Sequence, residues 1–352
     1  MAYKRKVLSI DGGGIRGIIP AMLLAEIERQ TGKRIADLFD LVAGTSTGGI
    51  IALGLTKPHP QDPSLPHFTA ADLVDFYKNY GKEIFYEPLH ERLTLFLDDL
   101  LKPKYHEGGR DRVLTELLGN IPLSSTIREV LLTSYDIDNR FPVFFTSDPR
   151  KEEIPDRGYR KVCNGFTMKQ SAMATSAAPT YFRPYQIPTD DPTRNGAYVL
   201  VDGGVFANNP TALAIIEIIG TYRIDMQSKG LPNQNLPVDE VLVLSLGTGS
   251  LTRAYSYKQA RNWGILKWIK PLINITLDGT SEVVAVQLNH LLAPHQLHRF
   301  QGFLDPGRGN DEIDKISDKN IADLESLARS IIKERKHDIE KLCETLLEPN
   351  VG

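Results

Sequence analysis

The segment Gly44-Thr45-Ser46-Thr47-Gly48 has the Gly-x-Ser-x-Gly spacing of a serine nucleophile. It lies between two apolar runs, so we expect a strand before it and a helix after it. Glycines two residues on either side of the serine allow the sharp turn that presents the hydroxyl at the sheet edge. The free amides at the start of the helix would stabilise an oxyanion there. The pattern favours acyl transfer by Ser46, and its alternative is an ordinary strand-to-helix turn.

Residues 11–17 read Asp-Gly-Gly-Gly-Ile-Arg-Gly and form a second glycine-rich turn, after the first apolar run. Successive glycine amides can point inward and bind an anion. The turn from Gly12 to Gly17 could therefore hold a phosphate or an oxyanion, and the positive charge of Arg16 suits a site that stabilises negative charge. The alternative for Arg16 is a salt bridge on the first turn of a helix.

The same turn matches the Gly-x-Gly-x-x-Gly fingerprint of dinucleotide-binding proteins, with Gly17 as its last glycine. That fingerprint expects an acidic residue about 20 residues further on, at the end of the second strand. Asp37 and Asp40 precede or open that strand, whereas Gly44 and Ser46 occupy its end. The missing acid argues against a nucleotide site in this turn.

A serine hydroxyl needs a base within hydrogen-bond reach, and Asp202 is our candidate. It ends an apolar run and is followed by Gly203 and Gly204. Active sites gather where the strands of a parallel sheet end, so we expect Asp202 to face Ser46 across that edge. The alternative is a turn aspartate that accepts hydrogen bonds from nearby amides.

Three histidines that follow Asp202 offer a rival base, because Ser46, Asp202 and one of them would repeat the chain order of the α/β-hydrolase triad. They are His290, His295 and His298. However, the nucleophile turn follows the second strand and the glycine turn follows the first, which is not the α/β-hydrolase order. None of the three lies in a glycine-flanked turn. A serine–aspartate dyad is therefore preferred over a Ser-Asp-His esterase.

Apolar runs of strand length alternate with helical patterns, which predicts an α/β fold with a mainly parallel central sheet and helices on its faces. The expected strands are 6–10, 38–43, 129–135, 141–146, 198–201 and 240–246, and a helix is expected over 70–80. We expect one catalytic domain over residues 1–310. Residues 311–352 are predicted to be helical, as one long helix or two, either packed on that domain or acting as a lid.

Two further segments bear on how the chain would reach a lipid. Residues 263–277 place Trp268 and other apolar side chains at helical spacing beside lysines, which suits a membrane interface. The alternative is a helix that faces the core, and Pro271 argues against an unbroken helix. Residues 93–101 are a second apolar stretch that could line an acyl groove.

Composition excludes several classes of function. The 352 residues are 41% hydrophobic, which is enough for a large core. The net charge of −3 gives no reason to expect nucleic acid as a partner. The two cysteines, Cys163 and Cys343, suggest neither disulfides nor zinc. The sequence has no signal peptide pattern and no membrane-spanning run. We expect a cytoplasmic protein, peripheral at a membrane surface, without cofactor or metal. The oligomeric state is not predicted.

Taken together, the 11–17 turn, the 44–48 turn and Asp202-Gly203-Gly204 resemble the signature of the patatin-like phospholipase family. The resemblance continues through 174–182, 208–210 and 244–249, and covers residues 5 to 250. It implies a three-layer α/β/α sandwich, Ser46 as nucleophile, Asp202 as general base and Gly12, Gly13 and Gly14 as oxyanion hole. It also implies catalysis without a metal.

The resemblance implies a lipid acyl hydrolase of phospholipase A or galactolipase type that works through an acyl-enzyme. Its partner would be membrane glycerolipid, met by transient interfacial contact. Because a carboxylate is a weaker base than an imidazole, we expect apolar surroundings to raise the pKa of Asp202. Two other functions are considered: a bacterial defence phospholipase switched on by a cyclic nucleotide, and a storage protein with a vestigial site.

Overall fold

The computed structural model describes residues 3–85, 103–153, 158–190, 195–231, 234–250, 254–304 and 312–350. The predicted acyl-groove segment 93–101 therefore lies outside the described residues. Within them, no helix combines the length and apolar character needed to cross a membrane.

Among the described residues, a nine-stranded sheet forms the centre of the molecule, in the order β5-β4-β3-β2-β1-β8-β9, with β7 paired to β3 and β6 paired to β7. Strands β1, β2, β3, β8 and β9 are parallel, whereas β4 and β7 run antiparallel to β3. The bounds are β1 Arg5–Ile10, β2 Leu41–Thr45, β3 Glu129–Asp136, β4 Phe141–Thr146, β5 Arg160–Val162, β6 Tyr185–Pro188, β7 Ala197–Asp202, β8 Val241–Leu246 and β9 Leu297–Phe300.

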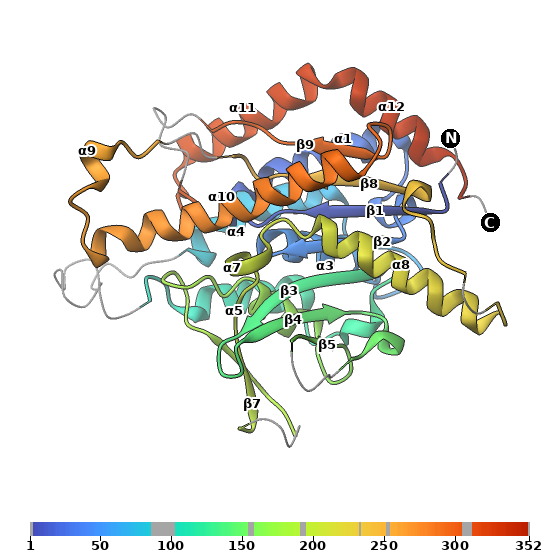
Figure 1. The fold of residues 1–352 in the computed structure, drawn as a ribbon, viewed down its shortest axis with the longest axis horizontal. Helices are drawn as coiled ribbons and strands as arrows, with labels where there is room; N and C mark the ends of the chain where they lie inside the picture. Colours follow the sequence, from blue (N-terminus) through green and yellow to red (C-terminus); the bar gives the residue numbers. More distant parts are fainter. Residues whose placement is uncertain are drawn as a thin grey trace.

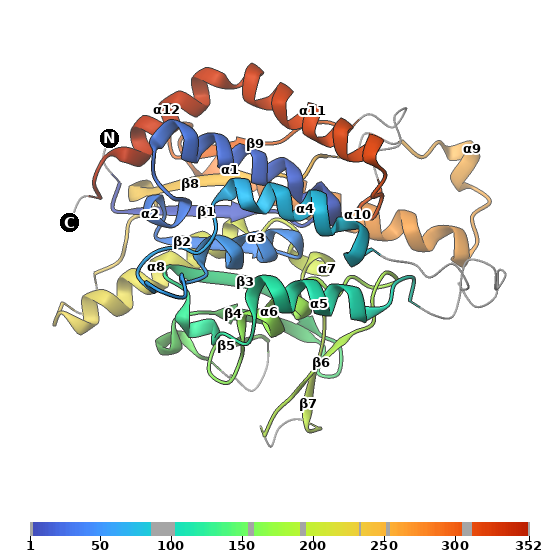
Figure 2. The same ribbon diagram turned by 180° about the vertical axis from the view of Figure 1, so that it is seen from behind.

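Helices cover both faces of this sheet, which confirms the three-layer α/β/α prediction (Figures 1 and 2). Helices α8 and α10 lie on one face, and α1, α3, α4, α5 and α6 lie on the other, with α11 and α12 packed on α1. The bounds are α1 Ile18–Thr31, α2 Ile35–Leu38, α3 Thr47–Thr56, α4 Ala70–Ile84, α5 Glu107–Leu118, α6 Met168–Thr175, α7 Gly204–Ala207, α8 Thr211–Ser228, α9 Tyr257–Ala260, α10 Ile265–Leu291, α11 Asp318–Glu334 and α12 Lys336–Leu347.

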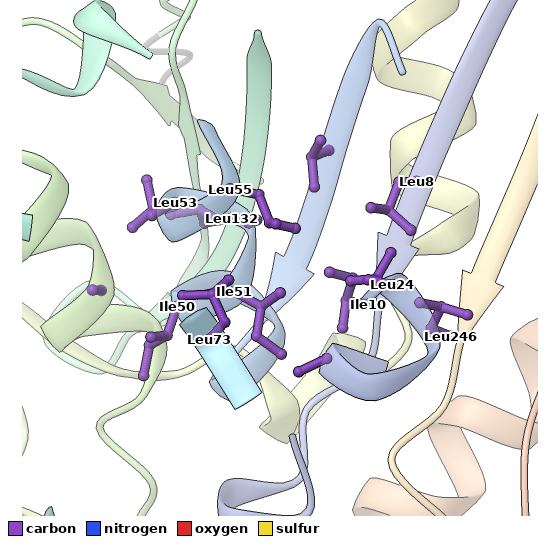
Figure 3. Close-up of a cluster of buried hydrophobic side chains, with 14 of the residues drawn as sticks. Leu8, Ile10, Leu24, Ile50, Ile51, Leu53, Leu55, Leu73, Leu132 and Leu246 are labelled. Atoms are coloured by element: carbon purple, nitrogen blue, oxygen red, sulfur yellow. The ribbon is translucent and has the colours of Figure 1, made fainter. Parts of the chain in front are cut away.

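The apolar side chains of the parallel strands alternate between two cores. Leu8 and Ile10 of β1 belong to the larger core, under α1 and α3, whereas Val7 packs under α8 on the opposite face. Figure 3 shows part of the larger core, with labelled side chains that include Ile10 of β1, Ile51 of α3 and Leu132 of β3. Because successive strand residues point to opposite faces, both faces of the sheet must be covered, which the two helical layers accomplish.

Two predicted elements differ from the structure. The second strand was expected over 38–43 but spans Leu41–Thr45, because residues 35–38 form the short helix α2. Pro271 lies inside α10 without ending it. The C-terminal region forms two helices, which is one of the two predicted arrangements, and the first of them begins only at Asp318. Its Leu324 and Leu342 are buried in the larger core. The division at residue 310 stays a prediction.

Candidate active site

The pairing of β3 brings the ends of two distant strands together. Ser134 of β3 pairs with β4 on one side, so β7 must lie on the side of β3 that β2 also occupies. On that side Thr45 pairs with Thr133, and Asp202 pairs with Ser134. The last residues of β2 and β7 therefore meet along a single edge of β3. This register places Ser46, which follows Thr45, next to Asp202.

Ser46 occupies a strained backbone position between β2 and α3. Its φ of 56° is in a region that residues with a side chain rarely adopt. The turn needs glycine on both sides, since a Cβ on Gly44 would collide with the backbone of Gly48, and one on Gly48 would collide with the carbonyl of Ile10. The geometry is that of a nucleophile turn between a strand and a helix.

Asp202 is the last residue of β7 and is 5% exposed. Its carboxylate accepts a hydrogen bond from the Ser46 side chain and one from the Gly204 amide at 2.8 Å. Burial raises the pKa of Asp202 to about 6, while the hydrogen bonds from Ser46 and Gly204 and the charge of Arg110 act in the lowering direction. The pKa of Asp202 is therefore raised, which is the direction of shift that the sequence predicts. Unlike the expectation, however, Asp202 arrives on an antiparallel strand.

The glycine turn lies beside Ser46, but its amides are not equivalent. The Gly12 amide donates to the carbonyl of Asn208 at 3.0 Å, so it is already occupied. A Cβ on Gly12 would collide with the Asn208 side chain, which explains the glycine there. Within the described part of the chain, the amides of Gly13 and Gly14 have no acceptor, and both residues line the pocket that contains Ser46. These two amides are the candidate oxyanion donors.

Arg16 lies behind the turn and is 2% exposed. Its guanidinium donates to the carbonyl of Gly13 at 3.3 Å and to that of Gly249 at 3.4 Å. It therefore ties the glycine turn to the loop after β8. The turn is held from two other sides, because Thr248 donates to the Gly12 carbonyl and the amide of Ile15 donates to the carbonyl of Ile313.

The remaining predicted glycines allow close packing around the two central residues. A Cβ on Gly17 would meet the side chain of Thr47, and one on Gly203 would meet Thr133. Gly204 supplies the amide that hydrogen-bonds Asp202, and it packs against Leu277 of α10.

A pocket of about 310 Å³ opens from Ser46 and Asp202. Its walls are mostly apolar and include Ile50, Phe182 and Leu272. His290, His295 and His298 do not line it; His290 and His295 are exposed, and His298 lies on β9. The described residues therefore give the rival triad no support.

Two residues that sequence reasoning missed also belong to this site. Thr175, at the end of α6, accepts a hydrogen bond from the Ser46 amide at 2.9 Å through its hydroxyl. Arg110 of α5 lines the pocket and is 1% exposed. Its sequence context, Glu-Gly-Gly-Arg-Asp-Arg, is typical of a solvated helix start and gives no sign of burial.

The described residues contain no group of three His, Cys, Asp or Glu side chains placed to hold a metal ion. The groups that meet in the pocket are a hydroxyl, a buried carboxylate hydrogen-bonded to it and two amides. These are the elements that acyl transfer requires: a nucleophile, a base and donors for the developing negative charge.

Comparison with known proteins gives consistent matches. A sequence model described as Patatin-like phospholipase matches residues 8–215. Patatin-like protein 1 of Arabidopsis thaliana is 35% identical over 79% of this chain and 68% of its own length. Patatin-like protein 2 of Oryza sativa subsp. indica is 31% identical over 98% of this chain and 84% of its own length. A Solanum tuberosum protein named "Probable inactive patatin-3-Kuras 1" is 36% identical over 76% of this chain and 69% of its own length.

Proposed function

The chain belongs to the patatin-like phospholipase family, a family of lipid acyl hydrolases, and on that premise we propose that it cleaves fatty-acyl esters of membrane glycerolipids through Ser46 and Asp202. The observation that carries the proposal is the hydrogen bond between the Ser46 side chain and the buried Asp202 carboxylate, at the base of an apolar pocket. An apolar pocket of this kind suits an acyl chain.

The proposed reaction has two steps. The Ser46 oxygen attacks the ester carbonyl carbon while Asp202 takes the hydroxyl proton, and the amides of Gly13 and Gly14 hold the oxyanion. The intermediate collapses, the C–O bond of the ester breaks, and Asp202 returns the proton to the leaving alcohol. Water then attacks the acyl-enzyme and gives its proton to Asp202. The fatty acid leaves, and the proton returns to the Ser46 oxygen.

Helix α10 is the proposed contact with the membrane. Leu272, Ile273 and Leu277 line the pocket, so its first half forms part of the pocket wall. The same half exposes apolar side chains to solvent, among them Ile265 at 83% and Leu272 at 56%. Figure 1 shows that the first half of α10 extends beyond the sheet, on the side where α9 lies. Its exposed apolar side chains therefore do not face the core.

Charge and aromatic residues support this interface. From Ala254 to Leu277 the sequence has four cationic residues and no acidic one, although the whole chain has a net charge of −3. The rings of Trp263 and Trp268 contact each other edge to face at 5.1 Å, and Trp268 is 40% exposed. Basic residues beside apolar and aromatic side chains are typical of helices that bind anionic lipid surfaces.

The test is product analysis from mixed glycerolipid vesicles incubated with the purified protein alone and with the Ser46→Ala variant. We expect free fatty acid from the natural protein without any added small molecule, and a loss of at least about 1,000-fold in the variant. The named inactive relative shows why the measurement is needed. Hydrolysis that survives in Ser46→Ala would contradict the proposal. Hydrolysis that appears only with an added cyclic nucleotide would instead identify a signal-activated phospholipase.

A further inference from the structure

Three consecutive residues, Thr175, Ser176 and Ala177, connect the nucleophile with the base. The Thr175 hydroxyl accepts a hydrogen bond from the Ser46 amide at 2.9 Å and donates to the Thr133 carbonyl at 2.7 Å. The Ala177 carbonyl accepts from the Asp202 amide at 3.0 Å. We call residues 175–177 the bridging segment. A displacement of this segment would change the separation of Ser46 and Asp202.

Arg110 holds the middle of the bridging segment. Its Nη1 donates to the carbonyl of Ser176 at 2.5 Å, and its guanidinium lies 4.1 Å from the centre of the Phe182 ring. Helix α5, which carries Arg110, packs against α6, which leads into the bridging segment (Figure 2). The side chain therefore links a surface helix to the backbone between the two central residues of the site.

The charge of Arg110 is not neutralised locally. In the part of the chain that the structure describes, no carboxylate lies within 4.0 Å of its guanidinium, and its Nε and Nη2 have no acceptor. Burial lowers the pKa of Arg110 to about 10, so it stays a cation at neutral pH. The charged or titratable groups that act on it from a distance are Glu107, Asp202, Tyr185 and Asp111. Asp202 is the one among them that belongs to the site.

A ligand-binding role fits the guanidinium less well. Nε and Nη2 would form a fork suited to a phosphate or carboxylate. Each of these atoms, however, has less than 1 Å² of accessible surface, and the Phe182 ring lies against the guanidinium. An anion could reach the fork only after the groups that cover these two nitrogens moved. The observed contacts favour a role in which the positive charge of Arg110 acts on neighbouring groups of the protein.

We propose that Arg110 is a positioning residue that holds Ser46 and Asp202 in register through the bridging segment and stabilises the ionised carboxylate of Asp202 through its uncompensated charge. The role rests on the proposed function, because it concerns the same two groups. A cation close to a buried carboxylate favours the charged form, which is the form that can take a proton from Ser46. The groups that face this carboxylate are the Ser46 hydroxyl, the Gly204 amide and Arg110.

The test compares Arg110→Met and Arg110→Lys with the natural protein on a soluble, uncharged short-chain ester. In Arg110→Met we expect the acidic limb of the pH–rate profile to move upward by about half a pH unit to one unit. Above that limb, kcat is expected to fall about 10-fold with KM within about 2-fold, because the loss is one of geometry. Arg110→Lys keeps a charge and a donor and should return the limb close to its original pH.

Arg112→Met is the matched control, since Arg112 lies on the same helix, is exposed and pairs with Glu83 outside the pocket. Its profile should match that of the natural protein. Equal melting temperatures of the variants and the natural protein would show that the variants are folded. An acidic limb that stays in place in Arg110→Met would overturn the proposal. So would a loss confined to phospholipids with the neutral ester unchanged, which would indicate phosphate binding.

A second measurement does not depend on turnover. The carboxyl carbon of Asp202, assigned by its absence in Asp202→Asn, can be titrated by NMR in protein labelled at aspartate. Arg110→Met should raise the pKa of this carboxyl relative to the natural protein. If no hydrolysis depends on Ser46, the proposed function fails, while this titration still supports or overturns the effect of Arg110 on Asp202.

Discussion

At the scale of single residues, the site depends on one carboxylate kept in an apolar place. An aspartate in water is too weak a base to take a proton from a hydroxyl near neutral pH. Burial of Asp202 raises its pKa to about 6, which makes it a stronger base that is still mostly ionised at pH 7. Ser46 and the Gly204 amide hydrogen-bond the charged form and keep the rise from going further.

This balance predicts the pH dependence of the reaction. Asp202 must be ionised to act as a base, so kcat/KM on a soluble ester should be lost as the pH falls through about 6, rather than near 4 as for an ordinary aspartate. The measurement is a pH–rate profile between pH 4 and pH 9, with a check that the protein stays folded at each pH. A profile that is flat down to about pH 4.5 would count against Asp202 as the base.

At the scale of elements, the surroundings of α10 differ between its two ends. Its first half combines pocket-lining and exposed apolar residues, whereas Leu288 near its end is buried against the smaller core. The helix is therefore anchored at one end and presents its other end to solvent. This arrangement places an apolar surface next to the pocket, at the position of the proposed contact with a membrane.

The prediction for this element concerns Trp268. Its replacement by Glu should lower the hydrolysis of anionic phospholipid vesicles roughly 10-fold or more, because a charge at the interface opposes apolar insertion. Hydrolysis of a soluble ester should stay within about 2-fold. Ile216→Glu is the control, since Ile216 is an exposed apolar residue of α8 at 64% and does not line the pocket. Equal losses on both substrates would argue against an interfacial role.

Elements also show how far the sequence can be read. Long apolar runs such as 129–135 and 141–146 predict β3 and β4 almost to the residue, because turn residues bound them. Strands β5, β6 and β9 have three or four residues each, too few for periodicity to detect. They depend on pairing with neighbours that are distant in sequence. In the second strand, apolar residues on both sides of Asp40 hid the boundary between α2 and β2.

For the site, the pattern makes Ser46 and Asp202 the candidates because their glycine neighbours mark sharp turns at strand ends. It does not show that β7 runs antiparallel to β3, since strand direction depends on connections through the whole fold. It also does not reveal Arg110, whose burial results from the packing of α5 against α6 and Phe182. Polar residues buried by tertiary contacts leave no local signal.

At the scale of the whole molecule, the site lowers the stability of the fold. The Asp202 pKa is raised on folding, from 3.8 to about 6, so the native state prefers the protonated carboxyl. The stabilisation that the folded state gains by keeping this proton on Asp202 is fully present below about pH 4 and is lost as the pH rises through about 6. Two pKa units correspond to a free energy on the order of 3 kcal/mol. At pH 8 the folded protein therefore carries a buried charge that opposes folding.

Asp202→Asn should remove this penalty. We expect the variant to have a free energy of unfolding about 1 to 3 kcal/mol higher than the natural protein at pH 8, with the difference shrinking toward zero as the pH falls to 4. Urea unfolding of both proteins across this range measures it, and ionisations that the two proteins share cancel. A variant that is less stable at pH 8 would mean that the hydrogen bonds of the carboxylate outweigh its desolvation.

The hydrogen bond between the amide of Ile15 and the carbonyl of Ile313 joins the glycine turn to a residue that is synthesised much later. Ile313 also forms part of the pocket wall. During translation, a growing chain would already hold its serine and its aspartate while this wall was still missing. The pocket would therefore gain this part of its wall only after residue 313 had been added, long after Ser46 and Asp202.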